Sequence, residues 1–201
     1  GDYVTIIGHN GSGKSTLVNL IPRFYDASNG HVSVFGRDVK EYGRGELNRI
    51  VGVVPQKAVL FAGSIRDNMK FGNENATDEE IYHALELAQA KEIVEKKEGA
   101  LDYMVEQGGK NFSGGQLQQL AIARALMNDP AILLLDEATS SMDLVLERKI
   151  LNNLKRRSCT CVIIAHRLST VRDCDLILVM RDGDVIEQGT HEELLAAGGA
   201  Y

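Results

Sequence analysis

Short apolar runs alternate with stretches of helical spacing along most of the chain. Four of these runs predict buried strands, because each contains four or five mainly apolar residues: Tyr3–Ile7, Val51–Val54, Ala131–Leu135 and Cys161–Ala165. Apolar runs of this kind are typical of central strands that are covered on both faces. A further strand is expected at His31–Phe35, where polar and apolar residues alternate before Gly36. Strands in alternation with helices predict an α/β protein with a mainly parallel sheet.

A different pattern begins near residue 64, where apolar residues recur at helical spacing. Thr77 and Glu80 are the two ends of a capping box, and the apolar positions that follow it are Ile81, Ala84, Leu85 and Ala88. We therefore expect a helical subdomain at residues 63–127, inserted into an α/β core of residues 1–62 and 128–201. Near the end of the core, Asp182-Gly183 predicts the turn of a β-hairpin.

The segment after the first strand carries the strongest chemical signal. Gly8-His9-Asn10-Gly11-Ser12-Gly13-Lys14-Ser15, followed by Thr16, fits the phosphate-binding pattern G-x-x-x-x-G-K-[ST] between a strand and a helix. Glycines let the backbone curl so that several N–H groups point at one anion. Lys14 can supply a cation for the β- and γ-phosphates, and Ser15 a hydroxyl for Mg²⁺. The alternative is an ordinary glycine-rich turn, and the flanking strand and helix argue against it.

Polar side chains follow three of the predicted strands, at the edge where α/β sheets bind ligands. Asp136, at the end of its strand, suits Mg²⁺, and Glu137 can point elsewhere, at an attacking water. His166 ends the next predicted strand, and its position at this edge favours a functional role over a structural one. Gln56 could reach a metal or its water, although an exposed loop glutamine is the simpler interpretation.

A second candidate anion site lies at the start of a helix. Ser113 can cap this helix, with Gln116 at the third position, and Gly114 and Gly115 lie in the first turn. Two glycines weaken a helix by about 1 kcal/mol each relative to alanine. They are useful where a ligand must approach the backbone closely, and a plain capped helix is the alternative.

Composition excludes some classes of protein. The chain has 201 residues, a formal net charge of −6 and a pI of about 5.4, so it lacks the overall positive charge that attracts nucleic acid. Cys159, Cys161 and Cys174 make no even set for disulfides, and buried reduced thiols of a cytosolic protein are expected rather than a metal site. The longest apolar runs are far too short to span a bilayer, so any membrane segment would lie elsewhere.

The order of these motifs resembles the nucleotide-binding domain of ABC transporters over essentially the whole chain. In that family the residues correspond to the Walker A loop from Gly8 to Thr16, the Q-loop Gln56 and the signature Ser113-Gly114-Gly115-Gln116. The Walker B strand ends at Asp136 and is followed by the catalytic Glu137, the D-loop at residues 140–143 and the switch histidine His166. The resemblance implies a P-loop NTPase core of the RecA type. Segments 60–68, 166–171 and 187–194 resemble the exporter branch, and Phe112 stands where the family usually has leucine.

The resemblance implies an ATPase that works as a head-to-tail pair of such domains. ATP and Mg²⁺ bound at Lys14 and Ser15 of one copy would be closed over by Ser113 and Gly115 of a second domain, identical or different. Asp136 and Gln56 would stand behind Mg²⁺, Glu137 would polarise the water, and His166 would contact the γ-phosphate. A transmembrane domain, fused upstream, would be driven through the region from Gln56 to Phe71. The domain itself would be soluble and lie at the cytoplasmic face of the plasma membrane, and an upstream segment would supply two strands and the aromatic residue that stacks on adenine.

Other readings remain open beside an exporter. A soluble ABC-type ATPase without transport would carry heptad insertions or tandem cassettes, and this chain has neither. The ATP-binding subunit of an importer is a further alternative. A GTPase would need an N-K-x-D guanine reader, which is absent from the sequence, and a pure binding module would be expected to lack Glu137 or His166.

Overall fold

The computed structural model describes the backbone of residues 1–201 and every side chain except that of Leu168. The chain divides into two compact units, each of which is described by itself. The first unit contains Gly1–Val53, Ala131–Glu137 and Cys159–Tyr201, and the second contains Val54–Pro130 and Ala138–Ser158. The predicted division at residues 62 and 128 differs from these units in its boundaries, and the assignment of domains by residue remains a prediction.

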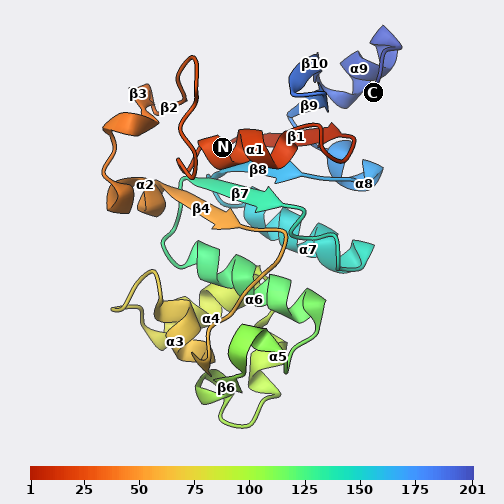
Figure 1. Ribbon diagram of the computed structural model, residues 1–201. Coiled ribbons are helices and arrows are strands. Elements are labelled where there is room, and N and C mark those ends of the chain that lie inside the picture. Colours follow the sequence, from red (N-terminus) through yellow and green to blue (C-terminus); the bar gives the residue numbers. More distant parts are fainter. The chain divides into compact units, whose positions relative to one another are not determined.

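The first unit is built on a six-stranded sheet in the order β10-β9-β1-β8-β7-β4 (Figure 1). Its strands are β1 (Tyr3–Gly8), β4 (Val51–Val54), β7 (Ile132–Asp136), β8 (Thr160–Ile164), β9 (Leu176–Arg181) and β10 (Asp184–Gly189). β1 pairs in parallel with β8 and β9, and β8 pairs in parallel with β7. β9 and β10 form the predicted antiparallel hairpin about Asp182-Gly183. The expected α/β fold with a mainly parallel sheet is therefore confirmed.

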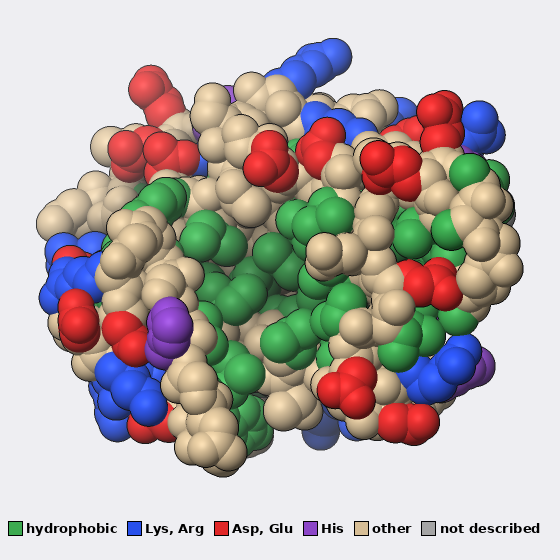
Figure 2. Space-filling view, turned by 90° about the horizontal axis from the view of Figure 1, so that it is seen from above, with side chains coloured by type: hydrophobic (Ala, Val, Ile, Leu, Met, Phe, Trp, Pro, Cys, Tyr) green, Lys and Arg blue, Asp and Glu red, His purple; other side chains and the backbone are tan. Residues whose placement is uncertain are grey.

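The core of this unit lies where the sheet meets helix α1 (Lys14–Leu20). Ile6, Val18, Leu134 and Ile164 are at most 2% exposed and belong to one apolar cluster. The three leucines in the middle of β7 are fully buried, as the run of consecutive apolar residues predicted. Apolar side chains also gather in the middle of the face shown in Figure 2, with charged side chains around them.

A small polar lobe follows α1. The predicted strand at His31–Phe35 is shorter than expected: β2 covers Ser33–Val34 and pairs with β3 (Arg37–Asp38). The reason is local, because Phe35 and Gly36 have φ angles of 50° and 76° and so form the turn between the two strands. The 3₁₀ helix η1 (Val39–Glu41) and helix α2 (Arg44–Ile50) complete the lobe.

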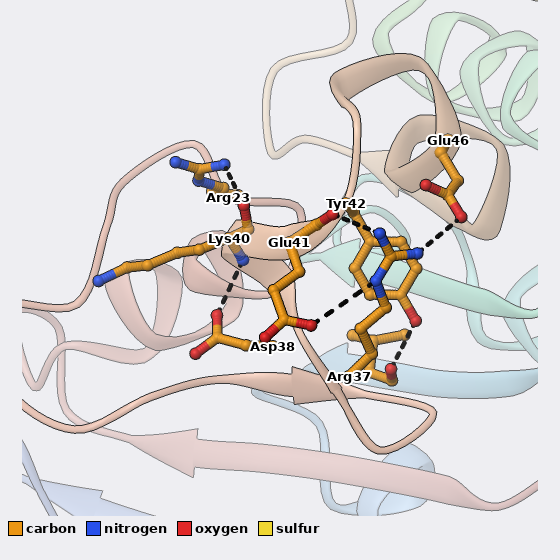
Figure 3. A network of polar contacts seen from close by, with 8 residues as sticks. Arg23, Arg37, Asp38, Lys40, Glu41, Tyr42 and Glu46 are labelled. Carbon is orange, nitrogen blue, oxygen red and sulfur yellow. Dashed lines mark hydrogen bonds and ion pairs between the residues drawn. The ribbon is translucent and has the colours of Figure 1, made fainter.

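Arg37 is the centre of a polar network in this lobe (Figure 3). Its guanidinium donates to Glu46 Oε1 at 3.0 Å and to the carbonyl of Glu41, and it lies 4.3 Å from the centroid of the Tyr42 ring. The Tyr42 hydroxyl donates to the carbonyl of Val34 at 2.7 Å. The network therefore ties the β2–β3 turn to α2, largely through exposed groups.

The second unit is mainly helical. It contains α3 (Ile65–Lys70), α4 (Asp78–Leu87), α5 (Lys91–Glu95), α6 (Gly114–Leu126) and α7 (Leu144–Lys155). Its short elements are β5 (Gly63–Ser64), which pairs with β6 (Met104–Val105), and the 3₁₀ helices η2 (Ala100–Asp102) and η3 (Gln107–Gly109). The predicted capping boxes at Thr77 and Ser113 are both present. Helices α4 and α6 supply much of the core, since Ile81, Leu85, Leu120 and Ile122 are fully buried.

Two short helices follow the sheet strands of the first unit. Helix α8 (Leu168–Val171) precedes β9, and helix α9 (His191–Ala197) begins with a capping box between Thr190 and Glu193. Across the described part of the chain, no helix combines the length and the apolar character that crossing a membrane requires. The three cysteines are free and buried, as expected from the sequence.

Candidate active site

The loop between β1 and α1 depends on its glycines. A Cβ on Gly8 would lie 2.3 Å from the carbonyl oxygen of Met180 and 2.7 Å from Ser12 Oγ, so no larger residue fits there. Gly11 and Gly13 have φ angles of 81° and 93°, which other residues rarely adopt. The loop is closed by hydrogen bonds from Ser12 N to the His9 carbonyl and from Gly183 N to the Ser12 carbonyl, both 3.1 Å. The backbone therefore adopts the tight curl that the motif predicted.

Lys14 lies within this loop rather than in solvent. Lys14 is 5% exposed, and its Nζ donates to the carbonyls of Gly8 and His9 at 2.9 and 2.8 Å. The ammonium group is therefore held by two carbonyls of its own loop, and its charge acts on the nearby Asp136 carboxyl, whose pKa is raised by burial and lowered in part by this charge. Ser12 Oγ is buried and has no hydrogen-bond partner among the residues that the structure describes. A lysine cation and an unsatisfied hydroxyl in one loop suit an anionic ligand.

Asp136 ends β7, and its carboxylate is only partly satisfied. Burial raises the pKa of this carboxyl above its ordinary value, and a hydrogen bond with Ser15 opposes that shift. Its Oδ1 atom is buried and lacks a hydrogen-bond partner within the described part of the chain. The Asp136 carboxylate thus has one buried oxygen without a hydrogen-bond donor and is also hydrogen-bonded to the Ser15 hydroxyl. Hard oxygen ligands of this kind suit a cation such as Mg²⁺.

Glu137 follows Asp136 in an unusual backbone conformation. Its φ angle is 50°, in the left-handed region, while its N–H donates to the carbonyl of Ile164 on β8 at 3.2 Å. This left-handed conformation turns the chain as it leaves the sheet. Strained residues of this kind are common at functional sites, where the surrounding structure holds them in place.

His166 lies beside Glu137, as their positions after neighbouring strands predicted. His166 Nε2 is 2.7 Å from Glu137 Oε1, and the two side chains are 41% and 18% exposed. The first unit thus brings Asp136, Glu137 and His166 together at the carboxyl ends of β7 and β8. An exposed imidazole beside a partly buried carboxylate can accept, hold and pass on a proton.

Sequence reasoning missed one neighbour of His166. A cavity of about 270 Å³ is lined by His166, Gly8, Ala165 and the C-terminal Tyr201, among others. The Tyr201 N–H donates to Glu187 Oε2 at 3.1 Å, and the Tyr201 hydroxyl is 2.6 Å from His191 Nδ1. The available signal was the pair Glu187 and His191, two polar residues in the segment 187–194 that carries part of the family resemblance.

The remaining predicted site residues belong to the second unit. Ser113 and Gln116 satisfy each other's backbone N–H groups, at 3.2 and 3.0 Å. A Cβ on Gly114 would meet no atom within 4 Å, so this end of α6 is open. The carbonyl of Gln56 accepts a hydrogen bond from Gln118 Nε2 at 2.6 Å. Because Gln56 lies in a different unit from Asp136, its predicted contact with a metal stays a prediction.

Comparison with known proteins identifies the family of this chain. Residues 1–140 match the family model described as ABC transporter. The whole chain is 48% identical to part of "ABC transporter B family member 21" of Arabidopsis thaliana, of which it covers 16%. It is 42% identical to a protein of Staphylococcus aureus named as a candidate multidrug export ATP-binding/permease protein, of which it covers 35%. The chain therefore spans about a third of the length of these relatives, or less.

A solved structure gives the same result for the fold. The structure titled as a bacterial Atm1-family ABC exporter with ATP bound matches the whole chain with a TM-score of 0.95 and 38% sequence identity. The match covers 35% of that chain. The P-loop NTPase fold predicted from the sequence is confirmed by this likeness.

Proposed function

We propose, from the premise that this chain belongs to the ABC transporter family, that it binds and hydrolyses ATP to power export by a membrane domain. The observation that carries the proposal is the meeting of Asp136, Glu137 and His166 at one edge of the sheet whose β1 strand leads into the phosphate-binding loop. The family's ATP-binding domains hydrolyse ATP to drive transport, and the relatives named above favour export over a soluble ATPase or an importer.

ATP would bind with its phosphates in the loop from Gly8 to Thr16. Lys14 would exchange its bonds to the loop carbonyls for bonds to the β- and γ-phosphates, which attract the cation more strongly. The backbone N–H groups of Asn10, Gly11 and Gly13 would surround the same anion, together with the Ser12 hydroxyl. The unpartnered Ser12 hydroxyl supports this assignment.

Mg²⁺ would be held by Ser15 and Asp136, with Gln56 as a further oxygen ligand. The unpartnered Oδ1 atom of Asp136 and its link to Ser15 support this assignment. Among the described residues, no cluster of three or more His, Cys, Asp or Glu side chains could hold a metal alone, which agrees with an ion that takes several ligands from phosphates and water. When bound, Mg²⁺ would neutralise charge that develops on the β- and γ-phosphates.

Glu137 would orient the attacking water and accept its proton. The carboxylate is held by the strained backbone of Glu137 and by His166, so little side-chain freedom must be lost on the way to the transition state. His166 would keep contact with Glu137 or turn to the γ-phosphate, because one imidazole nitrogen can serve either partner in turn. Both residues would act on ATP bound to their own chain, from the edge of the sheet where β7 and β8 end.

A second domain would complete each site. The open end of α6, with Ser113 exposed and Gly114 free of neighbours, offers a serine hydroxyl and backbone N–H groups to a phosphate of another copy. Ser113, Gly114, Gly115 and Gln116 would thus act on the ATP that the opposite domain holds. The partner would be a second such domain, identical or different.

The transmembrane domain would contact the region between Gln56 and Phe71. Phe61 and Phe71 are 45% and 69% exposed, their rings lie 4.7 Å apart, and Arg124 lies 5.4 Å from the Phe61 ring centroid. An exposed aromatic pair beside a cation suits a protein partner. Since the relatives are about three times longer than this chain or more, we infer that such a membrane domain is fused upstream and that the protein works at the cytoplasmic face of the plasma membrane.

The decisive experiment is ATP turnover by the full-length protein, with the proposed upstream segment, and by its Glu137→Gln variant. The amide keeps the size of the side chain but cannot accept the proton of the water, so hydrolysis should fall by about 10²–10⁴-fold, the usual worth of a general base. ATP binding, measured by calorimetry, should survive. Turnover of the variant at the parent rate would remove Glu137 from this role, and absence of ATP binding to the parent would overturn the proposal as a whole.

A further inference from the structure

Gln118 is a buried glutamine that connects two motifs of the second unit. It lies on α6, five residues after the Ser113 cap, and is 5% exposed. Its Nε2 donates to the main-chain carbonyl of Gln56 at 2.6 Å. One side chain therefore joins the helix that begins with the signature residues to the backbone of the residue that we propose as a metal ligand.

The hydrogen bond from Gln118 to Gln56 has an energetic cost. Gln118 Oε1 is buried and has no hydrogen-bond partner among the residues that the structure describes. Burying an unsatisfied amide oxygen is unfavourable, so an apolar side chain of the same size would suit packing alone better. The donor Nε2 is thus the part of Gln118 that packing does not explain.

The segment that starts at Gln56 is held at both of its ends by side chains. At the far end, Asn68 accepts from the N–H of Phe61 at 2.8 Å and donates to the Phe61 carbonyl at 3.0 Å. Asn68 is 1% exposed and belongs to α3. Between these anchors the segment has no helix or strand, so side-chain contacts hold it: the bonds from α6 and α3 at its ends and the buried side chain of Leu60.

We propose that Gln118 is a positioning residue that makes the Gln56 segment and the signature end of α6 move together when ATP binds. This inference rests on the proposed function, because it assumes that ATP acts at Gln56 in one domain and meets Ser113 of the other. A change at Gln56 in one site would then reach the partner's site through a single buried hydrogen bond.

The neighbouring Gln119 offers a matched control. It is also 5% exposed, lies on the same helix, and donates Nε2 to the Gln89 carbonyl at 2.6 Å and to the Ala88 carbonyl at 3.4 Å. The two glutamines differ in the segment that they hold, since Gln89 follows α4 and belongs to no motif. Gln118→Met and Gln119→Met each remove one buried amide donor from α6, so a general loss of stability should appear in both variants.

The test compares both variants in the chain that also carries Glu137→Gln, in which ATP binds but is not consumed. Hydrogen exchange is followed in two peptides, one spanning Gln56–Phe61 and one spanning Ser113–Gln118, before and after addition of ATP. Parallel turnover measurements use chains with Glu137 intact. We expect ATP to protect both peptides in the parent and in Gln119→Met. In Gln118→Met the coupling between the two peptides should be lost. Protection of one peptide by ATP should then no longer be accompanied by protection of the other.

Turnover should follow the same pattern. Gln118→Met should lower kcat by about 3- to 30-fold with little change in KM, the usual range for residues that carry coupling, whereas Gln119→Met should leave kcat nearly unchanged. Equal effects of the two variants on exchange and kcat would overturn the inference, as would full coupling in Gln118→Met. If Gln118→Met does not fold, Gln118→Leu and Gln119→Leu form the second pair, because each removes the N–H donor without burying a charge. Loss of ATP binding in the parent would indicate failure of the proposed function instead.

Discussion

His166 Nε2 lies 2.7 Å from Glu137 Oε1, so the two side chains share a hydrogen bond although their residues are 29 positions apart. The bond joins the ends of two neighbouring parallel strands, β7 and β8. Each strand delivers one residue to the same edge, and the pairing register sets the distance between them. The two side chains are therefore expected to act as one unit.

The first prediction concerns this pair. His166→Ala should lower ATP turnover by about 10- to 100-fold, because a hydrogen bond to a charged group contributes ~1.5–3 kcal/mol. In the double variant with Glu137→Gln, turnover should be close to that of Glu137→Gln alone, since residues that act as a unit are not additive. Steady-state phosphate release measures all three variants. Effects that multiply in the double variant would show that the two side chains act independently.

Much of this site could be predicted because its signals are local. The glycines of the loop at residues 8–13, the apolar strand before Asp136 and the capping box at Ser113 each depend on a few neighbouring residues, and each lies where expected. The distance between His166 and Glu137 depends on strand pairing, so the sequence indicated only a shared edge. The bond from Gln118 to Gln56 joins positions 62 residues apart and has no local pattern, so it required the structure.

The short β2 shows where periodicity misleads. Alternation at His31–Phe35 fits a strand of five residues, but the left-handed φ angle of Phe35 ends the strand after Val34. The pattern describes which side chains are buried, and it contains little information about a turn that uses a residue other than glycine. The same limit applies to Glu137, whose left-handed conformation was not expected from the sequence.

The second prediction concerns the turn that follows Glu137. Thr139 donates its hydroxyl to Glu147 Oε1 at 2.6 Å, and the two residues are 6% and 3% exposed. Thr139→Val and Glu147→Leu should each lower the free energy of unfolding by about 1–3 kcal/mol, because each removes one member of this buried hydrogen bond. The double variant should cost less than the sum of the two, which urea denaturation can measure. Strict additivity would show that the bond contributes nothing to stability.

The third prediction concerns the buried thiols. A hydrogen bond with Cys159 and burial both raise the pKa of the Cys161 thiol above its ordinary value, and Cys161 is fully buried. The thiol should therefore stay protonated and unreactive in the folded protein at about pH 8.5, while in urea all three cysteines should react with a thiol reagent. The thiol of Cys161 in the unfolded chain loses its proton at about pH 8.5, so the free energy of unfolding should fall as the pH rises above that value. Rapid labelling of the folded protein would contradict this account.

The last prediction tests whether each site uses two domains. Ser113→Arg should spare ATP binding, because the open end of α6 is proposed to meet the ATP of the opposite domain, but it should stop hydrolysis by blocking closure. Lys14→Ala should remove most ATP affinity, since the phosphates lose their cation. Calorimetry measures binding, and phosphate release measures turnover.

Mixing the two variants gives the sharper result. In a mixed dimer, the chain with Ser113→Arg has an intact phosphate loop that faces the intact signature of the Lys14→Ala chain. The other site combines a defective loop with a blocked signature. One productive site should therefore form in each mixed dimer. If the two sites work independently, each mixed dimer should show up to about half of the turnover of a parent dimer. If instead each signature acted on its own chain's ATP, the intact Lys14 loop would face the blocked signature of its own chain and the mixture would stay inactive. A third mixture, of Ser113→Arg with a chain that carries both changes, has no productive site under either arrangement and provides the baseline.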